Sequence, residues 1–341
     1  MKHNCNNRRT QMHVVVAYND PDGDAPDDPD PDQISEAAVI DEADAVHRTI
    51  LATGRKSTLL PVRSLDTCLA QVRKLAPDLV FNLCEGLAGQ ARYEMHMAAI
   101  WELLNVAHTG NGALTLGISQ DKALSKQLFI AKGIPTPAFE LCEAVPESTN
   151  LNFPLIAKPS REDASLGIMA DAIIRNLAEL QKSVKRLLSK YHQPILVEEY
   201  IDGREFNVAV LGVKSPRALP VAEICFDKLS KEEPRITSYE AKWLKDHPLY
   251  AKTPSVCPAP IEPSLAAKLQ DISLRVYKAL GGRGYGRVDL RMDSKENIFV
   301  LEFNPNPDIS PDAGFSKALK AAGLSYEDFV ESMISESAGI L

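Results

Sequence analysis

Hydrophobic residues in the first third of the chain follow two alternating patterns. Short apolar runs predict strands, and apolar residues at helical spacing between these runs predict helices. Gly54 ends the first predicted helix, and Ser64 is the expected N-cap of the second. The strands are predicted at 12–18, 57–62 and 78–83, and the helices at 34–53, 64–76 and 92–104. Strands that alternate with helices indicate a parallel α/β sheet, in which ligands bind beyond the carboxyl ends of the strands.

Beyond residue 112 the pattern predicts hairpins as well as helices. Asp202-Gly203 separates two strand-like runs and is expected to turn a hairpin between them. A polar loop at 160–167 is expected to lead from one strand into a returning strand near 169–171. The predicted strands are 152–159, 195–201, 204–212, 217–226, 285–292 and 298–303, and the predicted helices are 113–117, 119–132, 176–190, 263–280, 317–322 and 326–335.

The last predicted hairpin carries the main chemical signal. Alternation along a strand places Arg287, Asp289 and Arg291 on one face of the first strand, and Glu302 and Asn304 on one face of the second. If these faces match, oxygen donors and a guanidinium converge, which suits Mg²⁺ and phosphate. The alternative is an ordinary hairpin with solvated polar faces. Against it, Glu302 interrupts the apolar run Ile-Phe-Val-Leu-Glu-Phe, where an unpaired charge would be costly.

Composition places the chain among ordinary globular proteins. Its 341 residues, 45% hydrophobic and 25% charged, suffice for two or three domains. A net charge of −8 argues against a nucleic-acid-binding surface, and no apolar run approaches the roughly 18 residues that span a bilayer. The six cysteines form no Cys-x-x-Cys pair, which favours free thiols in a reducing cytoplasm. We therefore expect a cytoplasmic protein with neither nucleic-acid nor membrane partners.

Two N-terminal segments lack a periodic pattern. Residues 1–11 are basic but have no apolar core of a secretory signal, so they are expected to form a frayed leader. Residues 19–32 carry Asp and Pro in near alternation, which predicts an extended, mobile loop. This loop is either a disordered insertion or a lid or recruiter of cationic ligands, and composition leaves both readings open.

The chemical motifs resemble those of a known family. Arg-x-Asp at 287–289, followed by Glu-x-Asn-Pro-x-Pro at 302–307, resembles the metal and phosphate signature of the ATP-grasp superfamily, and the D-alanine–D-alanine ligase-like group is the closest within it. The similarity extends with gaps from about Met12 to the end of the chain. It implies a three-domain ATP-grasp fold of the α/β (α+β) class. The expected parts are an N-terminal α/β domain at 12–112, a central subdomain at 113–196 and a C-terminal subdomain at 197–341.

The resemblance also assigns roles to individual residues. The cofactors it implies are ATP and Mg²⁺ (or Mn²⁺), with the metal held by Asp289, Glu302 and Asn304. The residues that would bind ATP are Lys122, Lys158 and Lys242 at the phosphates, Glu198, Glu199, Tyr200 and Ile201 at the adenine, and Glu205 at the ribose. The catalytic residues would be Arg287, Lys242 and Ser165. Without this context, Lys122 fits an exposed helix lysine, and Glu198 and Glu199 fit charges that protect an edge strand.

The substrate side departs from the family pattern. In the phosphate loop Asp163 replaces a glycine and Ala164 a serine, Trp243 replaces a tyrosine, and Ala313 falls near the place of another serine. The candidate substrate contacts are Glu36, Glu85 and Asp308, although Glu36 also fits a carboxylate at a helix N-terminus.

These contrasts predict an ATP-dependent carboxylate–amine ligase with substrates other than two D-alanines. It would form an amide bond between two small molecules through an acyl phosphate. One alternative is an ATP-grasp kinase that stops at the phosphorylated product. Another is a non-catalytic nucleotide-binding protein, which the acidic Asp163 suggests. By resemblance alone, a homodimer is expected.

Overall fold

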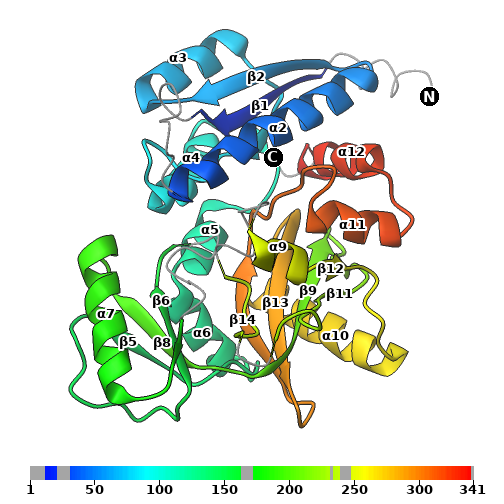
Figure 1. Ribbon diagram of the computed structural model, residues 1–341. Coiled ribbons are helices and arrows are strands. Elements are labelled where there is room, and N and C mark those ends of the chain that lie inside the picture. The colour runs from blue at the N-terminus through cyan, green and yellow to red at the C-terminus, as the bar shows by residue number, and fades with distance from the viewer. Residues whose placement is uncertain (1–11, 21–30, 163–171, 231–232, 239–246, 339–341) are drawn as a thin grey trace.

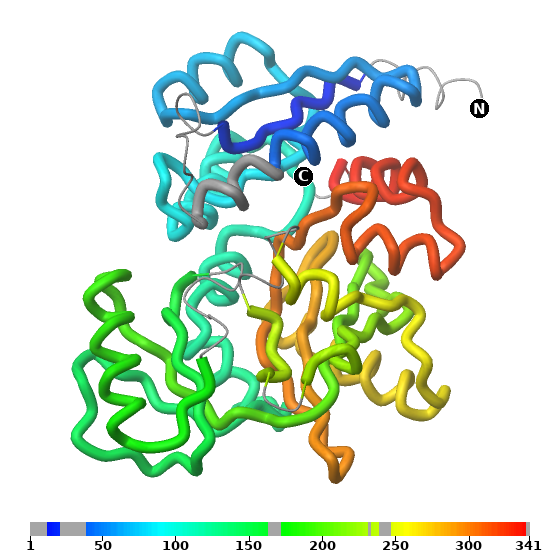
Figure 2. Tube along the Cα trace, in the orientation of Figure 1, coloured from blue at the N-terminus to red at the C-terminus, as the bar shows by residue number. Residues whose placement is uncertain are grey.

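Three β-sheets organise the part of the chain that the structure describes. The computed structural model describes residues 12–20, 31–162, 172–230, 233–238 and 247–338, the side chains of residues 31–38 excepted. Figure 1 shows the N-terminal sheet at the top, with the other two sheets side by side below it. The trace in Figure 2 shows the last helices, in red, returning to lie beneath the N-terminal sheet.

The N-terminal sheet is parallel and has helices on both faces. Its elements are β1 (His13–Asn19), α2 (Pro31–Ala52), β2 (Lys56–Val62), α3 (Leu65–Leu75), β3 (Leu79–Leu83), η1 (Ala91–Tyr93), α4 (Glu94–Leu103) and β4 (Ala107–His108). The strand order is β2-β1-β3-β4. Val14 and Val16 pack in a core with α2, whereas Val15 and Ala17 pack with α3 and α4. The predicted parallel α/β arrangement is confirmed, and Ser64 caps α3 as expected.

The second sheet is antiparallel and is covered by one amphipathic helix. Its strands are β5 (Phe139–Cys142), β6 (Leu155–Pro159), β7 (Ile173–Ile174) and β8 (Ile195–Glu199), in the order β5-β8-β6-β7. Helix α7 (Leu177–Tyr191) is capped by Asn176 and buries Leu180, Val184 and Leu187 against the sheet. The opposite face carries Lys158 and Glu198 beside the apolar side chains of Ile156 and Leu196.

The third sheet is the largest antiparallel layer. Its strands are β9 (Gly203–Leu211), β10 (Arg217–Ala218), β11 (Ala222–Ile224), β12 (Ser255–Val256), β13 (Tyr285–Asp293) and β14 (Ile298–Asn304). The order is β12-β11-β9-β13-β14, with β10 beside β9. Helix α10 (Pro263–Ala279) packs Leu269 and Val276 on one face. Helices α5 (Ala113–Gln120), α6 (Lys122–Ala131) and α9 (Pro248–Lys252) complete this part, with α5 and α6 in contact with β14.

The C-terminal helices join the N-terminal sheet to the third sheet. Helices α11 (Gly314–Ala321) and α12 (Tyr326–Ser337) bury Phe315 and Phe329 in the same core as Val14 of β1 and Tyr285 of β13. The end of the chain is therefore part of the core that holds its beginning. None of the helices among the described residues combines the length and the apolar composition needed to cross a bilayer.

Two sequence predictions about strands are wrong. The hairpin expected around Asp202-Gly203 does not form, because β8 pairs with β5 and β6 while β9 pairs with β13, β11 and β10. The Asp-Gly pair is a linker between two sheets, where tertiary pairing overrides a local turn signal. The single strand expected at 217–226 is divided into β10 and β11 around Pro220, which has no N–H to offer a ladder. The returning strand expected at 169–171 lies outside the described residues.

Candidate active site

The hairpin of β13 and β14 brings together the residues predicted to hold a metal ion. Its register pairs Asp289 with Glu302 and Arg287 with Asn304. Arg287 donates from Nε and Nη2 to the two carboxylate oxygens of Asp289 over 2.7 and 2.8 Å. Asn207 of β9, which the sequence pattern did not single out, donates to Asp289 Oδ1 over 2.8 Å. Two carboxylates, two amides and a guanidinium therefore meet on three neighbouring strands.

Burial makes Asp289 an unfavourable place for an isolated negative charge. Burial raises the pKa of the Asp289 carboxyl group; Arg287 opposes this shift, and Glu302 adds to it. A divalent cation would offset the repulsion between the two carboxylates. Within the described residues, no group of three or more His, Cys, Asp or Glu side chains is arranged to hold a metal ion. An ion here would therefore complete its shell with Asn304, water and substrate phosphates, as Mg²⁺ commonly does.

Lys122 lies buried beside this hairpin. It is the first residue of α6 and is only 5% exposed, so it is not the surface lysine of the alternative reading. Its Nζ lies 3.6 Å from Glu302 Oε2 and donates to the Glu162 carbonyl over 2.5 Å. The start of α6, which Asp121 caps, thus places the Lys122 ammonium group beside Glu302, one of the predicted metal ligands.

Lys158 and Glu198 meet on the second sheet. Lys158 Nζ of β6 lies 2.7 Å from Glu198 Oε1 of β8, and Lys126 Nζ of α6 lies 2.8 Å from Glu198 Oε2. Burial alone would raise the pKa of the Glu198 carboxyl group, but the two ammonium groups hold it below its usual value. Glu198 is therefore not a solvated edge charge. Sequence reasoning missed Lys126, although it stands four residues after Lys122 on the same helix face.

The segment after β8 has a backbone donor that a ligand could use. The N–H groups of Glu199 and Tyr200 donate to neighbouring backbone carbonyls, and the Glu199 carboxylate accepts two hydrogen bonds from Asn152. In the described part of the chain, the N–H of Ile201 has no hydrogen-bond partner. A nucleotide base could accept a hydrogen bond from Ile201 at this point, whereas the Glu199 side chain holds a loop.

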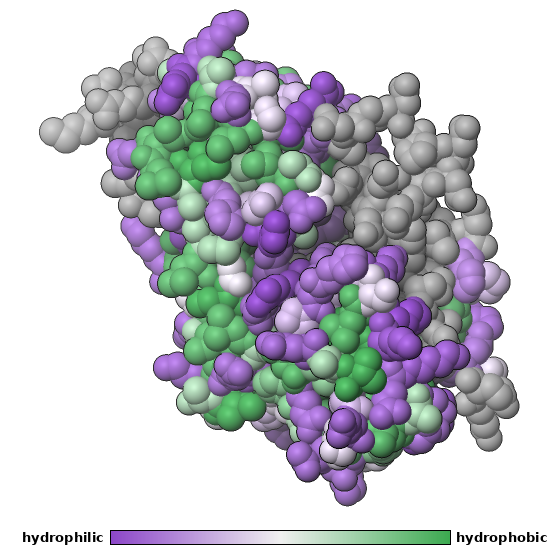
Figure 3. Space-filling model, turned by 90° about the vertical axis from the view of Figure 1, so that its left-hand side faces the viewer, coloured by the Kyte–Doolittle hydropathy of each residue, from purple (hydrophilic) through white to green (hydrophobic). Residues whose placement is uncertain are grey.

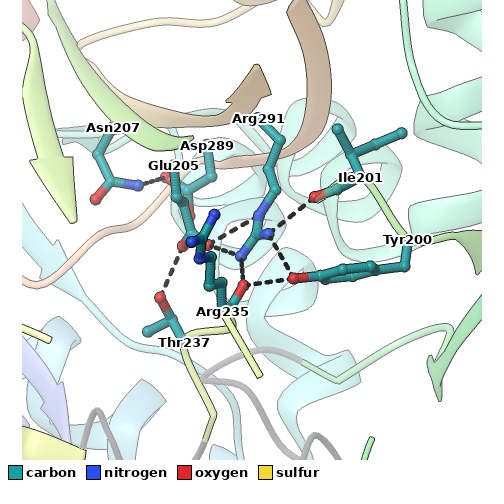
Figure 4. A network of polar contacts seen from close by, with 8 residues as sticks. All are labelled: Tyr200, Ile201, Glu205, Asn207, Arg235, Thr237, Asp289 and Arg291. Atoms are coloured by element: carbon teal, nitrogen blue, oxygen red, sulfur yellow. Dashed lines mark hydrogen bonds and ion pairs between the residues drawn. The ribbon is translucent and has the colours of Figure 1, made fainter. Parts of the chain in front are cut away.

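Glu205, the predicted ribose contact, is held by two neighbours (Figure 4). Thr237 donates to its Oε1 over 2.8 Å, and Arg291 donates to its Oε2 from Nε and Nη2 over 3.1 and 2.6 Å. A carboxylate offers about four acceptor positions, so one on Oε1 remains for a ligand. Arg291 stands two residues after Asp289 on the same strand face, where the alternation placed it, although the sequence assigned it no role.

Carboxylates gather where α2, the end of β3 and the loop after β14 meet. Glu42 of α2 is 5% exposed, and its Oε1 accepts a long hydrogen bond of 3.4 Å from the Ile309 N–H. Burial raises the pKa of the Glu42 carboxyl group well above its usual value, and Asp308 and Glu85 raise it further. The predicted contacts Glu85 and Asp308 therefore both lie within electrostatic range of Glu42, which was not predicted.

The remaining predicted residues lie outside the described part of the chain. Ser165 falls within 163–171 and Lys242 within 239–246, as do Asp163, Ala164 and Trp243. Glu36 lies in α2, but its side chain belongs to the excepted residues. The roles of these residues stay predictions.

Comparisons with known proteins agree with the fold. A family model described as the C-terminus of D-ala D-ala ligase matches residues 126–335. The uncharacterized protein y4sG of Sinorhizobium fredii is 36% identical over 310 residues, which cover 89% of this chain and 86% of that protein. A D-alanine–D-alanine ligase of Bordetella petrii is 32% identical over 298 residues, which cover 86% of this chain and 85% of the ligase. The crystal structure of D-alanine–D-alanine ligase from Bacillus anthracis complexed with ATP aligns with a TM-score of 0.73 at 19% identity, over 96% of this chain and 97% of that one.

The family model, the relatives and this arrangement of a parallel N-terminal sheet above two antiparallel sheets together define an ATP-grasp protein. This chain belongs to the D-alanine–D-alanine ligase family.

Proposed function

We propose that this protein is an ATP-dependent ligase that joins the carboxylate of one small molecule to the amine of another. The observation that carries the proposal is the meeting of Asp289, Glu302 and Arg287 on β13 and β14, with the Lys122 ammonium close by. Carboxylates, a guanidinium and an ammonium group at this range suit a metal–triphosphate complex. Membership of the D-alanine–D-alanine ligase family supports the same chemistry.

The nucleotide would be bound from both antiparallel sheets. Lys122 and Lys158 would contact its phosphates, and Lys242 would join them as the family resemblance predicts. The Ile201 N–H would donate to the base, and Glu205 would accept from the ribose. The residues that would hold Mg²⁺ or Mn²⁺ are Asp289, Glu302 and Asn304, and the ion would supply neutralisation of phosphate charge when bound.

The reaction would proceed in two displacements. The substrate carboxylate attacks the γ-phosphorus and ADP leaves, which produces an acyl phosphate. The amine then attacks the acyl carbon, loses a proton, and expels phosphate. Arg287 would stabilise the negative charge that develops in both steps, and Ser165 is proposed to assist it. The chain needs no covalent intermediate of its own, because its task is to position the reactants and balance their charges.

The substrate side supports substrates other than two D-alanines. We propose Glu85 and Asp308 as substrate contacts, with Glu36 as a further candidate. Asp308 and Glu85 lie close enough to Glu42 to raise the pKa of its carboxyl group. A group of carboxylates of this kind favours a substrate that carries an amino group. The alanine at position 313 stands where the family resemblance expects a serine.

A phosphate-release screen tests both parts of the proposal. Purified protein with ATP and Mg²⁺ would be offered amino acids and small carboxylates singly and in pairs, with mass spectrometry of the products. We expect phosphate release that requires one acid and one amine, together with an amide product. Turnover of two D-alanines at ordinary efficiency would contradict the substrate proposal alone. A phosphorylated product that needs no amine would replace the ligase proposal with a kinase.

A homodimer is the assembly that the resemblance implies, and we propose the surface around α4 and α5 for it. Leu103 and Leu114 are 85% and 74% exposed, the highest values for large hydrophobic side chains among the described residues. Figure 3 shows patches of apolar side chains on the side of the molecule that lies to the left in Figure 1. Exposed apolar surface of this kind commonly lies in a subunit interface. Sedimentation of Leu103→Glu and wild-type protein tests it: a variant that remains as dimeric as the wild type would contradict this surface.

A further inference from the structure

One guanidinium group, that of Arg291, connects three segments of the candidate nucleotide site (Figure 4). From β13 it donates twice to Glu205 Oε2 on β9, over 3.1 and 2.6 Å. It also donates to the Ile201 carbonyl over 2.9 Å, to the Arg235 carbonyl, and to the Tyr200 hydroxyl over 3.4 Å. An arginine has five N–H donors, and all of them are therefore engaged. Arg291 has no donor left with which to bind a ligand directly.

The guanidinium is also fixed by burial and by two aromatic rings. Arg291 is 3% exposed, and its guanidinium carbon lies 5.3 Å from the centre of the Tyr200 ring and 5.4 Å from that of the Phe226 ring. Its charge is balanced by Glu205, which is 8% exposed. Removing one member of such a pair leaves the other as a buried, uncompensated charge. Arg291 therefore holds its partners in place and does not act as a mobile cation.

The partner that matters for a ligand is Glu205. Two bonds from Arg291 occupy one carboxylate oxygen, and the Thr237 hydroxyl occupies one position on the other. This arrangement leaves a single acceptor position on Oε1 and sets its direction. The Ile201 and Arg235 carbonyls fix the guanidinium, so the carboxylate cannot turn without breaking its bonds to a fixed Arg291 and to Thr237.

We propose that Arg291 is a positioning residue that aims Glu205 at the hydroxyl groups of a nucleotide ribose. The proposal rests on the proposed function, because it takes a nucleotide to bind at this site. It goes further in naming the residue that makes the ribose contact selective. With Arg291 in place, Glu205 discriminates between a ribonucleotide and an analogue that lacks both ring hydroxyls. Without Arg291, the carboxylate loses its direction and the discrimination disappears.

The test compares the dissociation constants of ATP and 2′,3′-dideoxy-ATP, with Mg²⁺, by calorimetry. We expect wild-type protein to bind ATP roughly tenfold more tightly than the dideoxy analogue, the size expected for hydrogen bonds to a charged group. Arg291→Met should bind ATP about as weakly as wild type binds the analogue, with little change for the analogue itself. Glu205→Gln should behave in the same way. The double variant Arg291→Met with Glu205→Gln should be no worse than Glu205→Gln, because both residues act in one contact.

The chain offers a matched control on the neighbouring position of β9. Arg204 forms a two-pronged ion pair with Glu223 over 2.6 and 2.7 Å. Because Arg204 directly precedes Glu205 in β9, its side chain faces the other side of the sheet. Arg204→Met should keep the wild-type preference for ATP. Thermal melting of each variant distinguishes loss of the fold from loss of the ribose contact. The double variant Arg291→Met with Glu205→Gln is charge-neutral, so it controls for the effect of leaving the Glu205 carboxylate buried without a partner.

Three outcomes would overturn the inference and leave the proposed function standing. Arg291→Met that keeps the wild-type preference for ATP would show that Glu205 needs no positioning. An equal loss of affinity for both nucleotides would assign Arg291 to the fold instead of the ribose contact. Wild-type protein that binds the two nucleotides equally would remove the contact altogether. Wild-type protein that binds neither nucleotide is a distinct result, since it would overturn the proposed function and this inference with it.

Discussion

The ammonium group of Lys158 and the carboxylate of Glu198 lie 2.7 Å apart, in a pair that water hardly reaches. Lys126 approaches the same carboxylate from the other side at 2.8 Å and also donates to the Thr136 hydroxyl over 2.7 Å. Burial lowers the pKa of the Lys126 ammonium group, although Glu198 counteracts this shift. The three charges leave one positive charge in excess. Lys126 therefore balances Glu198, which leaves the charge of Lys158 for the phosphate that we propose it to bind.

Replacing Lys126 with methionine should weaken nucleotide binding without touching the nucleotide. Without Lys126, the negative charge of Glu198 would be neutralised by Lys158 alone. We therefore expect ATP affinity to fall roughly tenfold, the effect of one lost charge-assisted contact. Stability should fall by about 3 kcal/mol, because a buried ion cluster loses a member. Calorimetry with ATP and urea unfolding measure the two effects. Lys132→Met, at the exposed end of the same helix, is the control and should change neither.

Neutralising the predicted metal ligands should abolish the response of ATP binding to magnesium. Asp289→Asn and Glu302→Gln each remove one carboxylate from the hairpin, so Mg²⁺ should no longer enhance ATP binding. Turnover should fall on the order of 10²–10³, as for other lost electrostatic contacts in an active site. Titration of ATP binding against Mg²⁺ checks this without knowledge of the substrates. Glu296→Gln, in the exposed turn of the same hairpin, should respond as wild type does, and an unaltered response in Asp289→Asn would refute the metal site.

A buried histidine should make stability fall in mild acid. Arg283 Nη2 lies 2.6 Å from His108 Nε2, and burial, followed by the charge of Arg283, lowers the pKa of His108 to about 4. The unfolded chain binds this proton near pH 6.5, so the stabilising contribution is complete above that pH and is lost as the pH falls toward 4. Urea unfolding should show a loss of roughly 2 kcal/mol from this residue between pH 7.5 and pH 5.

Variants at two histidines test the assignment of this pH dependence. His108→Gln keeps an acceptor for Arg283 but cannot be protonated, so its stability should change less over the same pH interval. The exposed His96 is the comparison, and His96→Gln should retain the wild-type dependence. If the free energy of unfolding changed equally with pH in wild type and in His108→Gln, the pH dependence would belong to other groups.

A glycine at the start of β9 should tolerate no side chain. A Cβ atom at Gly203 would lie 1.9 Å from the Met292 carbonyl oxygen of the paired strand β13. Gly203→Ala must therefore displace one strand of the central pair, and we expect a loss of more than about 2 kcal/mol in the free energy of unfolding. Gly314→Ala at the start of α11, where a Cβ atom meets nothing within 4 Å, should be neutral or slightly stabilising. Equal stability of Gly203→Ala and wild type would contradict the close approach.

The sequence predicted those parts of the site that depend on short-range pattern. The β13–β14 hairpin is one, because alternation defines its faces and Asp293 accepts hydrogen bonds from the N–H groups of Lys295 and Asn297 to close the turn. The pairing of Asp289 with Glu302 follows from that turn and from the strand register. Both are settled within about twenty residues of chain, so no distant partner needs to be known.

Distant partners account for what the sequence could not predict. The Asp202-Gly203 signal is local, whereas Glu205 pairs with Arg291 on a strand far along the chain, and this pairing removes the expected hairpin. Lys126 and Glu42 are single residues on helices, where a charge is usually solvated. Only the sheet and loop packed against each helix make these charges buried, and periodicity contains no information about those neighbours.

The first strand of the chain completes its packing only against the last helices. Val14 and Val16 share a core with Phe329 and Ile334. A ribosome releases β1 long before it has made α12, so the part of this apolar face that α12 covers stays exposed through most of translation, even after α2 packs on the rest. We expect chaperones to bind this exposed face during synthesis. A chain that ends before α12 should therefore be susceptible to proteolysis in its N-terminal sheet.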